Sequence, residues 1–164
     1  MIRRMNEDRH TSTLLHREHY ANLDLLGRVE QALAGAPRRD AELVALVRTL
    51  GAHLAQEVDR HFGFEERELF GRMVESGEGD LAALLAEEHV TIRAVAAELA
   101  PLIGRAGAGT LDDAGWDALK RLALELVERL TAHIHKEESA LLPLLADLLD
   151  EDADRALALA YAAS

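Results

Sequence analysis

Residues 61–70 read HFGFEERELF and hold a histidine and a glutamate four positions apart. On an α-helix such residues share one face and lie one turn from each other. Residues 133–143, HIHKEESALLP, repeat the pattern H-x-x-x-E-E-x-x-L, and a Glu-His pair precedes each run at positions 18–19 and 88–89. Four histidines and two glutamates in such a repeat predict a metal site between four helices. The candidate ligands are His19, His61, Glu65, His89, His133 and Glu137.

Length and composition predict a single helical domain. The chain has 164 residues, which is long enough to bury a substantial core. Hydrophobic residues make up 49% of it and are mostly Leu and Ala, whereas aromatic residues make up only 4%. Leu and Ala have high helix propensity, and Gly and Pro are sparse within the long periodic stretches. We therefore expect an all-α fold.

Charge and residue usage exclude several classes of protein. The formal net charge is −12, and because binding to phosphates requires a basic face, we expect no nucleic-acid partner. The chain contains no cysteine, which excludes disulfides, cysteine-ligated metal sites and cysteine nucleophiles and fits the cytoplasm, our expected location. The first residues lack the apolar segment of a signal peptide, and no run approaches the roughly 18 apolar residues that cross a bilayer. We therefore expect no membrane association.

Helical periodicity divides the chain into three parts. We expect a flexible N-terminal arm over residues 1–11, a four-helix bundle over residues 12–149, and a C-terminal segment, residues 150–164, packed on or beside the bundle as a short helix over 151–162. Ser12 or Thr13 is the expected cap of the first helix.

Three features interrupt the helical pattern. Pro101 is expected to kink or end the third helix, and residues 104–110, GRAGAGT, form the most flexible-looking linker. Pro143 lies inside the fourth helix and should kink or close it.

Spacing within the repeat predicts the topology. His19 and His89 are 70 residues apart, and His61 and His133 are 72 apart, so the chain resembles two helical hairpins of one design. The first two histidines lie early in helices one and three, and the other two lie late in helices two and four. In an up-down-up-down antiparallel four-helix bundle these positions meet at the same level.

The donor types indicate which metals suit the site. Imidazole and carboxylate together favour iron or manganese, and zinc also stays open. A glutamate on each of two helices can bridge a pair of metal ions. Two octahedral ions offer roughly twelve positions, of which four histidines, two bridging glutamates and a bridging oxo or hydroxo group fill about ten. The remaining positions are expected to take water, dioxygen, nitric oxide or peroxide.

Residues near the candidate ligands have other expected roles. His53 lies eight residues before His61, too far along a helix to share the site. His135 is two residues from His133 and points elsewhere. His16 partly shares a face with His19 and is a candidate for an additional ligand. Four neighbouring acids are expected to be solvated or to orient a ligand imidazole, namely Glu18, Glu66, Glu88 and Glu138.

The motifs resemble the hemerythrin-like, or HHE cation-binding, family. The resemblance covers roughly residues 12–148 and is carried by Arg17-Glu18-His19, residues 61–70, Glu87-Glu88-His89 and residues 133–143. It implies a four-helix bundle with two non-haem iron ions bridged by an oxo or hydroxo group. The ligands it implies are His19, His61, Glu65, His89, His133 and Glu137.

The chain departs from the oxygen-carrying members of that family. Those carriers use a fifth histidine on the third helix, one turn before the other, where this chain has Leu85, and the position one turn after is Arg93. The acid of the fourth helix is Glu137, where the carriers have an aspartate at wider spacing. The ligand set looks closer to hemerythrin-like domains linked to iron or oxygen sensing and to peroxide or nitric oxide handling.

Two functions are consistent with these features. One is a module that binds or senses dioxygen, nitric oxide or iron, and as a sensor it would need a protein partner because the chain carries no output domain. The other is a di-iron enzyme that acts on peroxide or other reactive oxygen or nitrogen species, as a catalase or an oxidase does. Metal binding without further chemistry is the third alternative, and whether the chain is an enzyme stays open here.

Overall fold

The computed structural model describes residues 9–164, and the regular elements among them are all helical, which confirms the all-α class. The arm expected over residues 1–11 therefore lies mostly outside the described part of the chain. The α-helices are α1 (His10–Leu33), α2 (Ala41–His53), α3 (Asp59–Phe64), α4 (Phe70–Glu75), α5 (Gly79–Gly107), α6 (Asp113–Lys136), α7 (Leu142–Leu148) and α8 (Glu151–Ala162). Three π-helical turns connect some of them without a loop, namely η1 (Leu54–Val58), η2 (Glu65–Leu69) and η3 (Glu137–Leu141).

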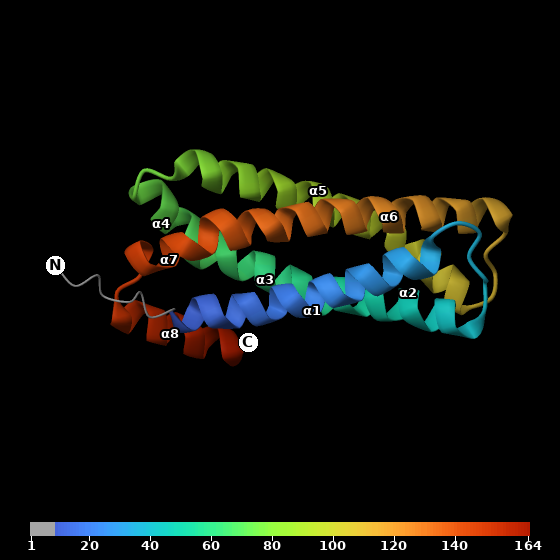
Figure 1. Ribbon diagram of the computed structural model, residues 1–164, viewed down its shortest axis with the longest axis horizontal. Helices are drawn as coiled ribbons and strands as arrows, with labels where there is room; N and C mark the ends of the chain where they lie inside the picture. The colour runs from blue at the N-terminus through green and yellow to red at the C-terminus, as the bar shows by residue number, and fades with distance from the viewer. Residues whose placement is uncertain (1–8) are drawn as a thin grey trace.

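Four helical rods lie lengthwise beside one another (Figure 1). The first rod is α1, the second runs from α2 through α4, the third is α5, and the fourth consists of α6, η3 and α7. Contacts join the first rod to the second and fourth, and α5 to the second and fourth. α8, the helix expected over residues 151–162, packs along α1 outside this set of rods.

The start of α1 differs from the expectation. The helix begins at His10, so neither Ser12 nor Thr13 caps it. Instead, the carboxylate of Asp154 on α8 accepts the backbone N–H of His10 at 2.8 Å and that of Thr11 at 3.0 Å. Sequence reasoning looked for a local cap, whereas this cap comes from a residue 144 positions away.

Neither Pro101 nor Pro143 ends its helical rod. Pro101 lies inside α5, which continues to Gly107, so the linker expected over residues 104–110 is helical for half its length. The buried side chains of Ile103 and Ala106 hold this end of α5 against the core. Pro143 does not close the fourth rod. It lies in the first turn of α7, which follows the π turn η3, and a proline is tolerated in the first turn of a helix.

The core has two hydrophobic clusters separated by a polar layer. One cluster includes Leu26 and Ile92, and the other includes Leu15 and Leu85. Along α1 and α5 the candidate ligand histidines lie between members of the two clusters, at positions 19 and 89. The polar layer is therefore sealed by apolar side chains above and below.

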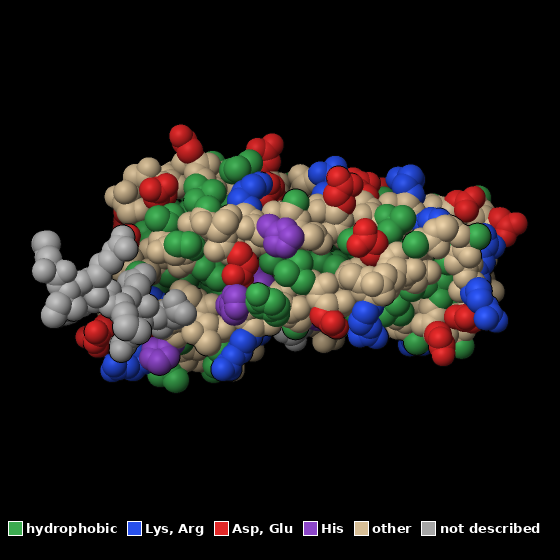
Figure 2. Space-filling model, in the orientation of Figure 1, with side chains coloured by type: hydrophobic (Ala, Val, Ile, Leu, Met, Phe, Trp, Pro, Cys, Tyr) green, Lys and Arg blue, Asp and Glu red, His purple; other side chains and the backbone are tan. Residues whose placement is uncertain are grey.

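Acidic and basic side chains are mixed over the face shown in Figure 2, with hydrophobic ones between them. Neither sign of charge gathers into a large patch there. In residues 9–164, no helix combines the length and the apolar character needed to cross a bilayer.

Candidate metal centre

The structure brings all six candidate ligands together from the four rods. Each is at most 3% exposed. They form two groups of four, within each of which the donor atoms lie no more than 4.8 Å apart. The first group is His19, His61, Glu65 and Glu137, and the second is Glu65, His89, His133 and Glu137.

The two glutamates belong to both groups because their oxygens point in different directions. Glu137 Oε2 lies 2.8 Å from His19 Nε2, and its Oε1 lies 2.6 Å from His133 Nε2. Glu65 Oε1 lies 3.0 Å from His61 Nε2, and its Oε2 lies 3.3 Å from His89 Nε2. Each carboxylate thus presents one oxygen to each group, as a bridging ligand does.

An outer set of four glutamates orients the imidazoles. Each imidazole donates its Nδ1–H to a carboxylate on a neighbouring rod, over 2.6 to 2.9 Å. The pairs are Glu18 with His61, Glu66 with His89, Glu88 with His133, and Glu138 with His19. Each rod contributes one outer glutamate, and the histidine at the centre of each rod donates to the outer glutamate of a neighbouring rod. The four contacts therefore form a closed ring around the centre. This orienting role, one of the two alternatives expected for these acids, is the one that the structure favours.

A basic side chain supports each outer glutamate. Arg60 donates to Glu18 over 2.7 Å, and Arg93 donates to Glu66 over 2.6 Å. Lys136 donates to Glu88, and His16 Nδ1 lies 2.8 Å from Glu138 Oε2. Burial alone would raise the pKa values of Glu18, Glu66 and Glu88, but hydrogen bonds from the imidazoles and the hydrogen bonds or positive charge of the basic partners lower them. Glu18, Glu66 and Glu88 are therefore ionised acceptors that hold the proton on Nδ1 of their imidazoles and direct Nε2 inward.

The inward-facing atoms fit a cation. His89 Nε2 and His133 Nε2 face each other at 3.1 Å, a gap that holds at most one proton. Two ligands at right angles on a metal, each about 2.1 Å from it, would lie about 3.0 Å apart. Glu65 Oε2 and Glu137 Oε1 are buried without a well-oriented hydrogen bond. Metal ions among these atoms would satisfy nitrogen lone pairs and carboxylate oxygens together.

The electrostatics of these buried side chains also indicate that the centre suits a cation. Burial opposes a charge on His89, yet hydrogen bonds to Glu137 and Glu65 raise its pKa to about 9. The pKa of His61 is likewise raised well above its ordinary value against the effect of burial, by Glu65 foremost. Burial would raise the pKa of Glu137, but the hydrogen bonds of His133 and three further imidazoles lower it strongly. Protons thus compensate the buried carboxylates, which is what a bound cation would do instead.

The remaining histidines lie outside the two donor groups. His16 contacts Glu138 and the edge of the Tyr20 ring, so it reaches the outer set and is not among the grouped donors. His53 is hydrogen-bonded to Asn22, and His135 is exposed, as its place two residues after His133 predicts.

Sequence reasoning missed two features of the centre. A π-helical turn begins at each grouped glutamate, η2 at Glu65 and η3 at Glu137, and such turns are frequent at functional sites. Pro143 lies six residues after Glu137 and is a weak local signal for η3. Gly71, at the same distance from Glu65, gives no such signal for η2. The second missed feature is Tyr161 on α8, whose hydroxyl donates to Glu18. Nothing in the local sequence marks this residue.

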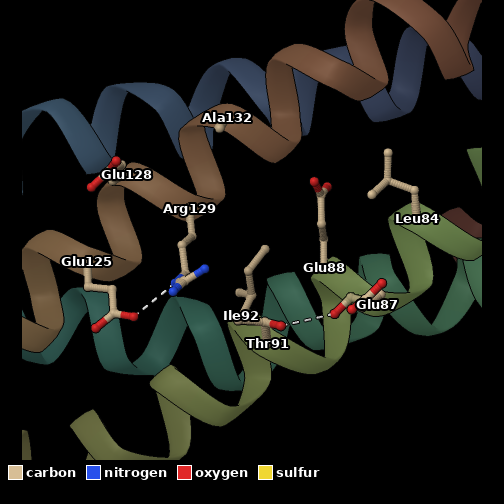
Figure 3. Close-up of a pocket in the computed structure, with 9 residues that line it drawn as sticks. All are labelled: Leu84, Glu87, Glu88, Thr91, Ile92, Glu125, Glu128, Arg129 and Ala132. Carbon is tan, nitrogen blue, oxygen red and sulfur yellow. Dashed lines mark hydrogen bonds and ion pairs between the residues drawn. The ribbon is translucent and has the colours of Figure 1, made fainter.

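Glu88 connects the centre to a surface hollow between α5 and α6 (Figure 3). The hollow has a volume of about 510 Å³, and Glu88 lines it together with Ile92 and Arg129. The same carboxylate accepts the Nδ1–H of His133 at 2.7 Å. Solvent in the hollow is therefore one hydrogen bond away from a candidate ligand.

Comparison with known protein families agrees with this geometry. The sequence model of the hemerythrin HHE cation binding domain matches residues 10–145, most of the chain. The chain belongs to the hemerythrin HHE cation-binding family. This confirms the resemblance, and the family match together with the buried His and Glu groups supports metal binding. A search of curated proteins found no match. All of α8 lies beyond the matched segment.

Proposed function

We propose that this chain is a non-haem di-iron protein that binds dioxygen or nitric oxide inside an up-down-up-down antiparallel bundle. The observation that carries the proposal is that the two donor groups share both glutamates. Glu65 and Glu137 each present one oxygen to either group, so the groups are adjacent and share bridging carboxylates. Glutamates from two helices hold metal pairs in this way in helical bundles.

The protein's own residues would hold the ions and leave room for a small ligand. His19 and His61 belong to one metal position, and His89 and His133 belong to the other. Four imidazole nitrogens and four carboxylate oxygens would hold the two ions, which leaves coordination positions for a small ligand. When bound, iron supplies reversible electron transfer and open coordination positions. The outer glutamates fix the orientation of the imidazoles and so of the Nε2 atoms that would hold the ions.

Burial of the centre selects for small ligands. The six donors are at most 3% exposed, and hydrophobic clusters cover them on both sides. The Phe62 ring stacks on His89 with a centroid distance of 3.7 Å and an interplanar angle of 6°. This burial favours a diatomic gas or peroxide, because a larger organic substrate would have to displace the covering side chains.

An enzyme acting on peroxide is a second candidate, and one observation favours it. Peroxide chemistry transfers protons, and His16 is a half-exposed base that shares the Glu138 carboxylate with His19. This arrangement supplies a proton-handling group at the edge of the centre. If the chain is a sensor, a protein partner is still expected. The cytoplasmic location expected from the absence of cysteine stays a prediction.

Substitution of Glu137 tests the di-iron proposal, and substitution of the adjacent Glu138 is the control. The protein is loaded with ferrous iron without oxygen, its metal content is measured, and spectra are recorded on exposure to air or nitric oxide. We expect two iron ions per chain and absorption bands of a bridged iron pair. Glu137→Gln should lose this pair, whereas Glu138→Gln should retain it with about 10–100-fold weaker binding.

Several outcomes would decide between the candidates. Reversible loss of the bands under vacuum supports ligand binding. Oxygen release from added peroxide that is abolished by His61→Ala and by His133→Ala supports the enzyme. A single bound metal ion in the wild type, with no optical response to either gas, would refute the di-iron proposal.

A further inference from the structure

The C-terminal helix reaches the metal centre through one side chain. Tyr161 on α8 donates its hydroxyl hydrogen to Glu18 Oε2. The same oxygen accepts the Nδ1–H of His61 at 2.9 Å, and Glu18 Oε1 accepts from Arg60 at 2.7 Å. The carboxylate thus has three donors on its two oxygens, and one of them comes from outside the four rods.

Packing fixes the Tyr161 ring in place. The residue is 3% exposed, and its ring lies 4.6 Å from that of Phe64, centroid to centroid. The Arg60 guanidinium lies 4.4 Å above the Tyr161 ring and also donates to the Tyr161 carbonyl at 2.9 Å. At the other end of α8, Asp154 caps α1. Two separate anchors therefore set the position of this helix against α1 and α3.

This contact distinguishes one metal position from the other. Within the described chain, Glu18 is the outer glutamate that accepts from a tyrosine. The glutamates that orient His89 and His133, namely Glu66 and Glu88, are supported by Arg93 and Lys136 from the rods themselves. α8 therefore acts on the His61 side of the centre.

We propose that Tyr161 is a positioning residue for the metal centre. Its hydroxyl fixes the Glu18 carboxylate against His61, and through it α8 sets the affinity and the ligand geometry of one metal position. That position is formed by His19, His61, Glu65 and Glu137. The inference rests on the proposed metal binding. It concerns a helix that lies wholly outside the matched family segment, and it makes the two metal positions unequal.

Cobalt(II) titration of the metal-free chain tests the inference, because the visible absorption of this ion reports its ligand geometry. Tyr161→Phe keeps the ring and removes only the hydroxyl. Removing outer partners of metal ligands costs about 10–100-fold in affinity, so we expect one of two binding steps to weaken about tenfold and its absorption bands to shift. The control is Tyr20→Phe, since Tyr20 is the other tyrosine of the chain and is 62% exposed.

Two further variants assign the step that changes. Glu18→Gln should weaken the same step as Tyr161→Phe, whereas Glu88→Gln should weaken the other one. Thermal unfolding of each metal-free variant checks that it is folded. If Tyr161→Phe does not fold, the comparison of Glu18→Gln with Glu88→Gln still tests whether the two steps belong to different sides of the centre.

The possible failures are distinguishable. Suppose that the wild type binds two cobalt ions. If Tyr161→Phe then binds them equally well with unchanged bands, or if both of its binding steps are weakened alike, the positioning role is wrong but the metal centre is supported. A loss for Glu18→Gln without any for Tyr161→Phe overturns it too. A wild type that binds no cobalt or iron overturns the proposed function itself.

Discussion

Substitution of Asp154 by alanine would remove the cap that α8 supplies to α1. The Asp154 side chain accepts the backbone N–H groups of His10 and Thr11 at 2.8 and 3.0 Å. Thr11 is fully buried, so water cannot replace the lost acceptor at its N–H, whereas the exposed His10 can be hydrated. The variant therefore leaves one backbone donor buried and unsatisfied.

The expected loss of stability follows from these two contacts. Loss of an N-terminal cap costs about 1 kcal/mol, and an unsatisfied buried donor costs about 1–3 kcal/mol. The free energy of unfolding should thus fall by about 2–4 kcal/mol. For a chain of this size, each kcal/mol lowers Tm by about 2–4 °C, so Asp154→Ala should lower Tm by roughly 4–16 °C.

Thermal and urea unfolding followed by circular dichroism measure this effect, and pH provides a second check. Burial would raise the pKa of Asp154, but the N–H groups of Thr11 and His10 lower it below its ordinary value. The stabilisation is therefore complete above about pH 4 and lost as the pH falls through the lower folded-state pKa. The difference between wild type and variant should shrink on that acid side.

Asp152→Ala is the matched control, because Asp152 lies in the same first turn of α8 and is exposed. It should change the free energy of unfolding by less than about 0.5 kcal/mol. Equal effects of the two substitutions, or a difference between wild type and Asp154→Ala that persists unchanged down to about pH 2, would refute the capping argument.

Three further predictions concern the centre and the rods. Metal binding at pH 7 should release protons, measured with a pH indicator, and the release should decline as the pH rises past the His89 pKa of about 9, because the imidazole is then already neutral. Phe62→Ala should lower the free energy of unfolding by about 3–5 kcal/mol in urea, since Phe62 is 3% exposed and stacks on His89. Gly27→Ala should raise Tm, because a methyl group there meets no atom within 4 Å and alanine stabilises a helix interior by about 0.5–1 kcal/mol.

Each of these three predictions has a control variant or an outcome that would contradict it. Proton release that does not vary between pH 7 and about pH 10 would contradict the raised imidazole pKa. Val74→Ala, at a side chain that is 60% exposed, should cost far less than Phe62→Ala. Gly35→Ala should be destabilising by about 1–2 kcal/mol, because Gly35 has φ +63°, and a gain there would argue against the backbone explanation.

The local pattern was sufficient to predict the helices, and it selected the six candidate ligands whose side chains the structure brings together. Helical periodicity of 3.6 residues and the H-x-x-x-E spacing depend only on neighbours within a turn or two, so they can be read from the chain. The helix over residues 151–162 and the exposed position of His135 were predicted on the same basis. The family match over residues 10–145 agrees with the motif-based resemblance.

Only the tertiary structure decided which residues pair across the rods. Asp154 caps α1 from 144 positions away, and Tyr161 reaches Glu18 across 143. The sequence identified Glu18 and Glu138 as acids beside the motifs, but the imidazole that each one orients lies on another rod. Such pairings depend on the rotation and register of packed helices, to which distant side chains contribute together, and no spacing along the chain records them.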